Sequence, residues 1–179
     1  MKCVVELFQN AELFEKVSRP DLREMGIRRQ ARESALQALF MVDFNDLWLN
    51  FSADVFYDSF GGDERTKVFS DLLIQGVIKN QAKLDSVITR ASENWSIQRM
   101  ARVDRAILRV ACYELCCLPE VPRNVTINEA IEISKKFGSE DSPMFINGVL
   151  DKIASYIDTI NAVDFDEEKE EVEPSKVRA

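Results

Sequence analysis

The sequence predicts an all-α protein of six to seven helices. Apolar residues recur at steps of three and four from about residue 28 to residue 160, which is the period of a helix with one buried face. Only six glycines and five prolines interrupt the 179 residues, and no segment shows a convincing strand pattern. Because 46% of the residues are hydrophobic, the chain can bury one substantial core.

The first helices are predicted at about residues 28–43 and 49–59. The pair Gly61-Gly62 forms a turn, and Asp63 suits the N-cap of a helix that either continues or bends through Ala91. A buried helix follows over about residues 103–118, after a junction of apolar and basic residues at 95–100. It ends before Pro119, since the residue before a proline disfavours the helical conformation.

Two more helices are predicted towards the C-terminus. Thr126 and Glu129 fit a capping box, in which the hydroxyl and the carboxylate bond to the first free amides of a helix. This helix stops at Gly138, a residue suited to the position after a helix end. The last helix opens with Ser142 as its cap and Pro143 at its first position.

The composition excludes several classes of function. The chain has no histidine, which removes histidine bases, Ser-His and Cys-His nucleophile pairs and mixed Cys/His zinc sites. It also contains no glycine-rich loop of the kind that holds a nucleotide. We therefore expect no enzyme activity, no cofactor and no metal site.

The net charge of −8 argues against a protein that coats nucleic acid non-specifically. Seven acidic and three basic residues lie in 164–179, so the rest of the chain is only mildly acidic. The four cysteines form no C-x-x-C pair, and no run of apolar residues reaches the length of a membrane span. We expect a cytoplasmic protein with reduced thiols and no membrane partner.

Three arginines, Arg28, Arg29 and Arg32, surround the start of the first helix. Spacings of three and four place them on one face, where guanidinium groups suit phosphate. The alternative is an ordinary solvated face. Between the last two helices, residues 137–148 carry Phe137 and Phe145, rings on which bases of single-stranded RNA could stack. The alternative is that both rings belong to the core.

A charged stripe follows the buried helix and is formed by Arg99, Arg102, Asp104, Arg105 and Arg109. It suits a partner or RNA, and internal pairing with acidic residues is an equal alternative. On the same helix, Cys112 and Cys116 lie one turn apart and are expected to be small core residues.

Three stretches, in this order and spacing, resemble the NusB family over about residues 27–160. They are Arg28-Arg29-Gln30-Ala31-Arg32-Glu33-Ser34-Ala35-Leu36-Gln37-Ala38-Leu39-Phe40, then Val103-Asp104-Arg105-Ala106-Ile107-Leu108-Arg109 with Tyr113-Glu114-Leu115, and Ile127-Asn128-Glu129-Ala130-Ile131-Glu132 continuing to Phe145-Ile146-Asn147-Gly148-Val149-Leu150-Asp151-Lys152.

The resemblance implies a NusB-like fold of two small helical subdomains. It also implies a transcription antitermination factor that pairs with NusE, a small-subunit ribosomal protein, to bind boxA RNA. Other Nus factors and RNA polymerase are then indirect partners, and the complex supports transcription of ribosomal RNA operons.

The resemblance assigns RNA contacts to six positions and the NusE-facing surface to two. The RNA positions are Arg28, Arg29, Arg32, Phe137, Asp141 and Phe145, and the NusE positions are Asp104 and Arg109. Gln30 and Met144 stand where relatives often carry a basic residue, and Phe40 stands where many have tyrosine. Fewer phosphate contacts predict weaker RNA binding that depends less on salt.

The chain is accordingly divided into three parts. Residues 27–162 form the NusB-like domain, and residues 163–179 form an acidic tail that we expect to be disordered. Residues 1–26 are an extension outside the resemblance, expected to be poorly ordered or not native, and Met25 is a candidate start.

Two alternatives remain open. One is an RNA-modifying enzyme, because NusB-like domains also occur fused to RNA cytosine methyltransferases; it requires a second domain with a nucleotide-binding loop, which the tail after residue 163 does not supply. The other is a helical interaction scaffold or homodimer without specific RNA binding.

Overall fold

The computed structural model describes residues 22–61, 63–93 and 95–160, and these residues form helices and no strand. The all-α class is therefore confirmed. The acidic tail and most of the N-terminal extension lie outside the described residues. The elements are α3 (Leu22–Asn45), α4 (Ala53–Phe60), α5 (Glu64–Ser92), the 3-10 helix η1 (Ile97–Arg99), α6 (Arg102–Cys117), α7 (Arg123–Phe137) and α8 (Ser142–Ile160).

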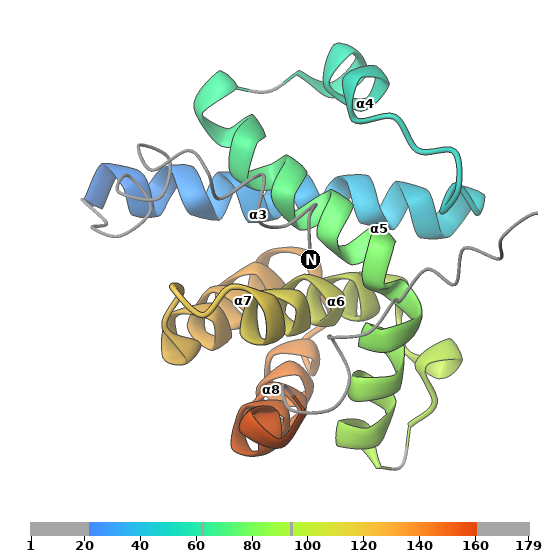
Figure 1. The fold of residues 1–179 in the computed structure, drawn as a ribbon, viewed down its shortest axis with the longest axis vertical. Helices are drawn as coiled ribbons and strands as arrows, with labels where there is room; N and C mark the ends of the chain where they lie inside the picture. Colours follow the sequence, from blue (N-terminus) through green and yellow to red (C-terminus); the bar gives the residue numbers. More distant parts are fainter. Residues whose placement is uncertain (1–21, 62, 94, 161–179) are drawn as a thin grey trace, which may run out of the picture.

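The helices form two layers joined by α5 (Figure 1). Helix α3 lies between α4 and the layer of α6 and α7, and α5 runs from the α4 end of the molecule to α8. Buried side chains from both layers belong to one continuous core, to which α3 contributes Leu39, α5 contributes Leu73, α6 contributes Leu108 and α8 contributes Leu150. None of the described helices is long and apolar enough to cross a membrane.

Two helix boundaries follow from the predicted local chemistry. The Asp63 carboxylate accepts a hydrogen bond from the Arg65 amide at 2.9 Å, so its role as the N-cap of α5 is confirmed. Helix α6 ends at Cys117, two residues before Pro119, as expected. The first helix was predicted too short, because α3 begins at Leu22 and ends at Asn45.

The predicted capping box at Thr126 is wrong. Helix α7 begins at Arg123, and the Thr126 amide donates to the Pro122 carbonyl at 3.1 Å as part of the helix. The Thr126 hydroxyl points to the Glu114 carboxylate instead, at 3.4 Å, and Glu129 pairs with Arg29. Both side chains bond to residues of other helices, so neither caps α7.

The end of α7 at Gly138 is confirmed, although for a different reason than a left-handed backbone. Gly138 has φ −91° and ψ −173°, an extended conformation that any residue adopts. A Cβ there would lie 2.6 Å from the Ser142 side chain and 2.8 Å from the Ser134 carbonyl. The Ser142 hydroxyl accepts from the Ser139 amide at 2.8 Å, so this corner closes tightly and leaves room only for glycine.

Gly76 sets the crossing of α5 over α6. A Cβ on Gly76 would lie 2.0 Å from the Tyr113 ring, which is buried between the two helices. The side chain cannot be accommodated without moving the ring or separating the helices.

We predict that Gly76→Ala destabilises the protein by about 1–3 kcal/mol through overpacking. Gly148→Ala is the matched control, because it lies in α8 with nothing within 4 Å of its added Cβ. That control should be neutral or stabilising by about 0.5–1 kcal/mol, since alanine is the better helix former. Urea unfolding measures both, and equal midpoints for the two variants would contradict the close approach.

Candidate nucleic-acid interface

Because α3 begins at Leu22, its arginines lie inside the first half of the helix and not at its start, and two of them meet carboxylates from α6 and α7. Arg32 makes a two-pronged ion pair with Glu114 of α6, with both N–O distances 2.7 Å. The two side chains are almost completely buried, at 4% and 1% exposure. Arg29 makes a similar pair with Glu129 of α7 at 2.8 and 2.6 Å, but its side chain remains 43% exposed.

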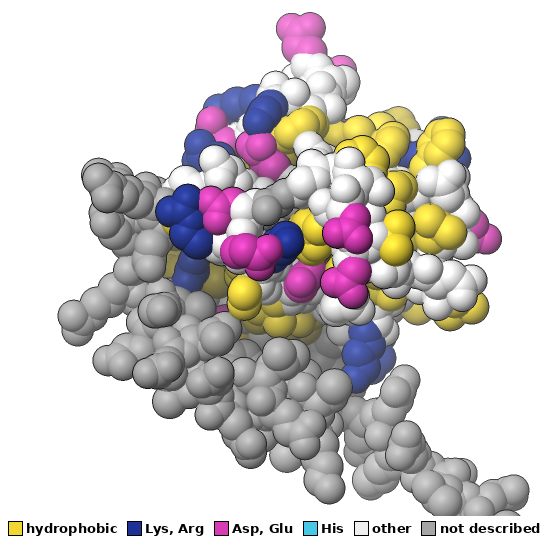
Figure 2. Space-filling model, turned by 90° about the horizontal axis from the view of Figure 1, so that it is seen from above, with side chains coloured by type: hydrophobic (Ala, Val, Ile, Leu, Met, Phe, Trp, Pro, Cys, Tyr) yellow, Lys and Arg dark blue, Asp and Glu magenta, His cyan; other side chains and the backbone are white. Residues whose placement is uncertain are grey.

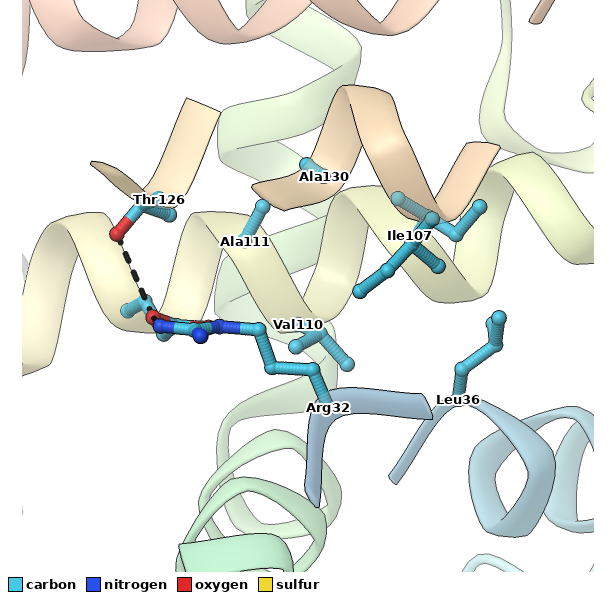
Figure 3. A pocket seen from close by; sticks show the side chains of 9 residues that line it. Arg32, Leu36, Ile107, Val110, Ala111, Thr126 and Ala130 are labelled. Atoms are coloured by element: carbon cyan, nitrogen blue, oxygen red, sulfur yellow. Dashed lines mark hydrogen bonds and ion pairs between the residues drawn. The ribbon is translucent and has the colours of Figure 1, made fainter. Parts of the chain in front are cut away.

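Arg32 remains charged in the buried pair. Burial by itself lowers the pKa of the Arg32 guanidinium, but the hydrogen bonds and the charge of Glu114 outweigh it, so that this pKa lies above its ordinary value. Figure 3 shows Arg32 reaching from α3 towards α6, with Thr126 of α7 on the far side of the carboxylate. The cavity beside the pair is only about 10 Å³, far too small for a base.

Arg28 and Arg32 also lie against an aromatic ring of α5. Their guanidinium carbons are 5.4 and 5.3 Å from the centre of the Phe69 ring. Glu33, the next residue of α3, pairs with Lys136 at the end of α7 at 2.6 Å. Arg29, Lys136 and their carboxylates thus form a polar strip where α3 lies beside α7.

The predicted aromatic loop joins α7 to α8, and its two rings are half-buried. Phe137 and Phe145 both pack against the core, and Lys136 lies 5.0 Å from the centre of the Phe137 ring. Asp141 is exposed in the turn between them, and its carbonyl accepts from the Phe145 amide at 3.1 Å. Each residue therefore packs against the core and remains partly exposed.

Trp95 belongs to the same surface, although sequence reasoning did not select it. Its ring lies edge-to-face with Phe145, with 6.5 Å between the centres. The mixture of apolar and basic residues at 95–100 was the available signal. Without the contact between the α5 end and α8, nothing in that mixture connects it to the Phe145 loop.

The charged stripe on α6 is used mainly inside the molecule. Arg109 is 3% exposed and makes a two-pronged pair with Asp85 of α5 at 2.7 and 2.8 Å. It also reaches Asp43 of α3 at 3.0 Å, and Arg105 pairs with the same carboxylate. For these two arginines the internal pairing considered from the sequence is what the structure shows.

Asp104 differs from the arginines around it. Its side chain lies in the first turn of α6 at 8% exposure, and its Oδ1 has no hydrogen-bond partner among the described residues. In the same turn, Arg102 covers the ring of Phe44 at 4.9 Å, and Phe44 stacks with Phe40 of α3 at 6.2 Å. A buried oxygen without a hydrogen-bond partner carries an energetic cost in the folded protein.

Hydrophobic side chains gather on one side of the face that carries α4 (Figure 2). The exposed large hydrophobics of this part of the chain are Phe44, Leu49, Val55 and Phe60. Such an apolar surface is typical of contact with another protein.

The cysteines of α6 form a tight thiol pair, with 4.0 Å between the sulfurs of Cys112 and Cys116. Cys112 is fully buried, as expected of a small core residue, and Cys116 is partly buried. Burial raises the pKa of the neighbouring Cys117 thiol to about 12. Among the described residues, no three cysteine or acidic side chains are placed to hold a metal ion.

Fold and surface together define a class: an all-α protein whose surface carries a half-exposed arginine, exposed apolar side chains and half-buried aromatic rings. Comparison with known proteins identifies the family. The NusB family model matches residues 29–155, and the chain belongs to the NusB family.

Close relatives carry the name transcription antitermination protein NusB. The protein from Geotalea daltonii is 50% identical over 139 residues, covering 73% of this chain and 96% of the relative. Those from Geobacter sulfurreducens and Bacillus subtilis are 52% and 44% identical, covering 73% of this chain and 96% and 97% of their own lengths.

Solved structures agree. NusB from T. maritima superposes with a TM-score of 0.64 at 37% identity, covering 72% of this chain and 90% of that one. A chain from a crystal structure of antitermination factors NusB and NusE in complex with dsRNA gives a TM-score of 0.63 at 22% identity, covering 73% of this chain and 98% of that one, which shows the shared fold.

We predict that Glu114→Ala destabilises the protein by about 3–5 kcal/mol, because it leaves the Arg32 guanidinium buried without its partner. Replacing both partners, as Arg32→Met with Glu114→Leu, should cost less than the single change. Urea unfolding measures both. Glu132→Ala breaks an exposed pair with Lys135 on α7 and should leave the midpoint unchanged. If Glu114→Ala were as stable as Glu132→Ala, the role of the buried pair in stability would be contradicted.

The Asp43 pair predicts an acid-dependent loss of stability. Burial raises the pKa of Asp43, but hydrogen bonds from Arg105 and Arg109 outweigh it and hold this pKa below its ordinary value. The stabilisation is complete above the unfolded pKa of about 3.9 and disappears as the pH falls through the lower folded value. The advantage of the wild type over Asp43→Asn in free energy of unfolding should be constant at pH 5–7 and shrink below about pH 4. A pH-independent difference would contradict it.

Proposed function

We propose that this protein is a cytoplasmic transcription antitermination factor, which binds single-stranded boxA RNA together with NusE and supports processive transcription of ribosomal RNA operons. Membership in the NusB family is the observation that carries the proposal, because the family model matches residues 29–155 and the relatives are named for antitermination. Other Nus factors and RNA polymerase are its indirect partners, and the protein itself catalyses no reaction.

The RNA surface combines few charges with several rings. Arg28 and the half-exposed Arg29 contact phosphate, while the exposed edges of Phe137 and Phe145 receive bases, and Asp141 accepts from a base edge. Arg32 is buried beneath this surface and helps to position it. Its guanidinium lies 3.9 Å from Glu129, the carboxylate that also orients Arg29. Few exposed arginines predict a modest dependence on salt.

The NusE surface lies at the other end of α3. Asp104 contributes its carboxylate from the first turn of α6, and in the same turn Arg102 covers the exposed ring of Phe44. Arg109 supports this surface from inside, where it holds Asp43 and lies 4.8 Å from the centre of the Trp48 ring. A partner donor that bonds to the Asp104 carboxylate gains a charge-assisted hydrogen bond.

The test is fluorescence anisotropy of a labelled boxA RNA and a scrambled RNA, with and without NusE, at two salt concentrations. NusE should strengthen binding of boxA RNA more than that of the scrambled RNA. Arg29→Gln should weaken boxA binding several-fold and lower the salt slope by about one, whereas exposed Lys79→Gln on α5 should leave both unchanged.

In the same assay, Asp104→Asn should reduce the gain from NusE and leave RNA binding without NusE unchanged. Asp151→Asn, an exposed carboxylate on α8, is its control. Equal binding of boxA and scrambled RNA under every condition would overturn the proposal and favour a helical scaffold or homodimer without specific RNA binding.

A further inference from the structure

Trp95 is a large aromatic residue held at the surface. It follows the end of α5 and precedes η1, and 49% of it is exposed. The other tryptophan of the chain, Trp48, is partly buried against the core and lies over Arg109. Exposing a large indole to water is unfavourable, and its flat face can stack with a planar ligand.

Trp95 is bonded to the end of α5. The Ser92 hydroxyl donates to the Trp95 carbonyl at 2.8 Å, and the Trp95 amide donates to the Ser92 carbonyl at 3.3 Å. Glu93 turns the chain with φ +42° and pairs with Lys152 of α8 at 3.0 Å. After the tryptophan, Ile97 is buried in the core. Trp95 is thus bonded to Ser92 on one side and followed by a buried residue on the other, which lowers the entropy lost on binding.

Arg99 completes the surface. Its guanidinium carbon lies 5.4 Å from the centre of the Trp95 ring, and its side chain is exposed. Among the described residues, no carboxylate forms an ion pair with it, unlike Arg32, Arg105 and Arg109. Arg99 is therefore a cation beside an exposed indole, and it is available to a phosphate.

We propose that Trp95, with Arg99 and the edge of Phe145, forms a stacking site for one unpaired base of the bound RNA. The base lies on the exposed part of the indole, and Arg99 contacts a phosphate next to that base. This inference rests on the proposed RNA-binding function and extends its surface from the α7–α8 loop to the end of α5. Because every base has a flat face, the site contributes affinity with little choice of sequence.

The first test uses Trp48→Phe, which leaves Trp95 as the only tryptophan of the chain. Titration with boxA RNA in the presence of NusE should quench its emission, because a stacked base contacts the indole directly. In anisotropy, Trp95→Ala should weaken boxA binding about ten-fold and Trp95→Phe should recover most of the loss, since base–aromatic stacking is worth roughly this much. Arg99→Gln should lower the salt slope by about one. Urea midpoints of all variants check that the fold is kept.

The second test identifies the base. A series of boxA RNAs, each with one abasic nucleotide, is titrated against the wild type and Trp95→Ala. At one position the abasic RNA should bind both proteins equally, because the stacked base is missing, while the ten-fold difference persists at all others. If the wild type prefers boxA RNA but shows neither quenching nor such a position, the stacking site is wrong and the proposed function stands. If the wild type shows no preference for boxA RNA, both are overturned.

Discussion

The buried ion pair between Arg32 and Glu114 determines how α3 sits on the rest of the molecule. Two parallel hydrogen bonds fix both the distance and the orientation of the helices, and neither group can be left in the core without the other. At the far end of α3, Asp43 receives Arg105 and Arg109 from the same helix, α6. Helix α3 is thus attached to α6 at two points about three turns apart, with apolar packing between them.

These pairs also decide which charges reach the surface. The sequence predicts that the arginines of α3 form one phosphate-binding cluster. In the structure they differ in burial, because Arg32 is internal and Arg29 is half-exposed. The same division separates Arg109 from Arg99 along the stripe that leads into α6. The proposed RNA surface has few available cations and several partly exposed rings, which favours stacking and contacts to bases over general attraction to phosphate.

The proposed partner surface and the proposed RNA surface lie on neighbouring segments of the chain. The turn that starts α6 carries Asp104 and Arg102, and it directly follows η1, where Arg99 covers Trp95. On the other side, Arg102 covers Phe44 of α3. In the proposed complex, a protein bound at Asp104 contacts the helix that follows η1, so binding of protein and RNA can reinforce each other through one short segment.

The sequence by itself determined what depends on neighbouring residues: the all-α class from apolar spacing, the cap at Asp63, the end of α6 before Pro119, and the family from three contiguous motifs. Only the tertiary structure decided which partner each polar side chain takes. Thr126 and Glu129 match a local cap, yet they bond to other helices, and Trp95 meets Phe145 across 50 positions of chain. The physical reason is that a helix period shows which face is buried, whereas pairing across faces depends on how the helices cross.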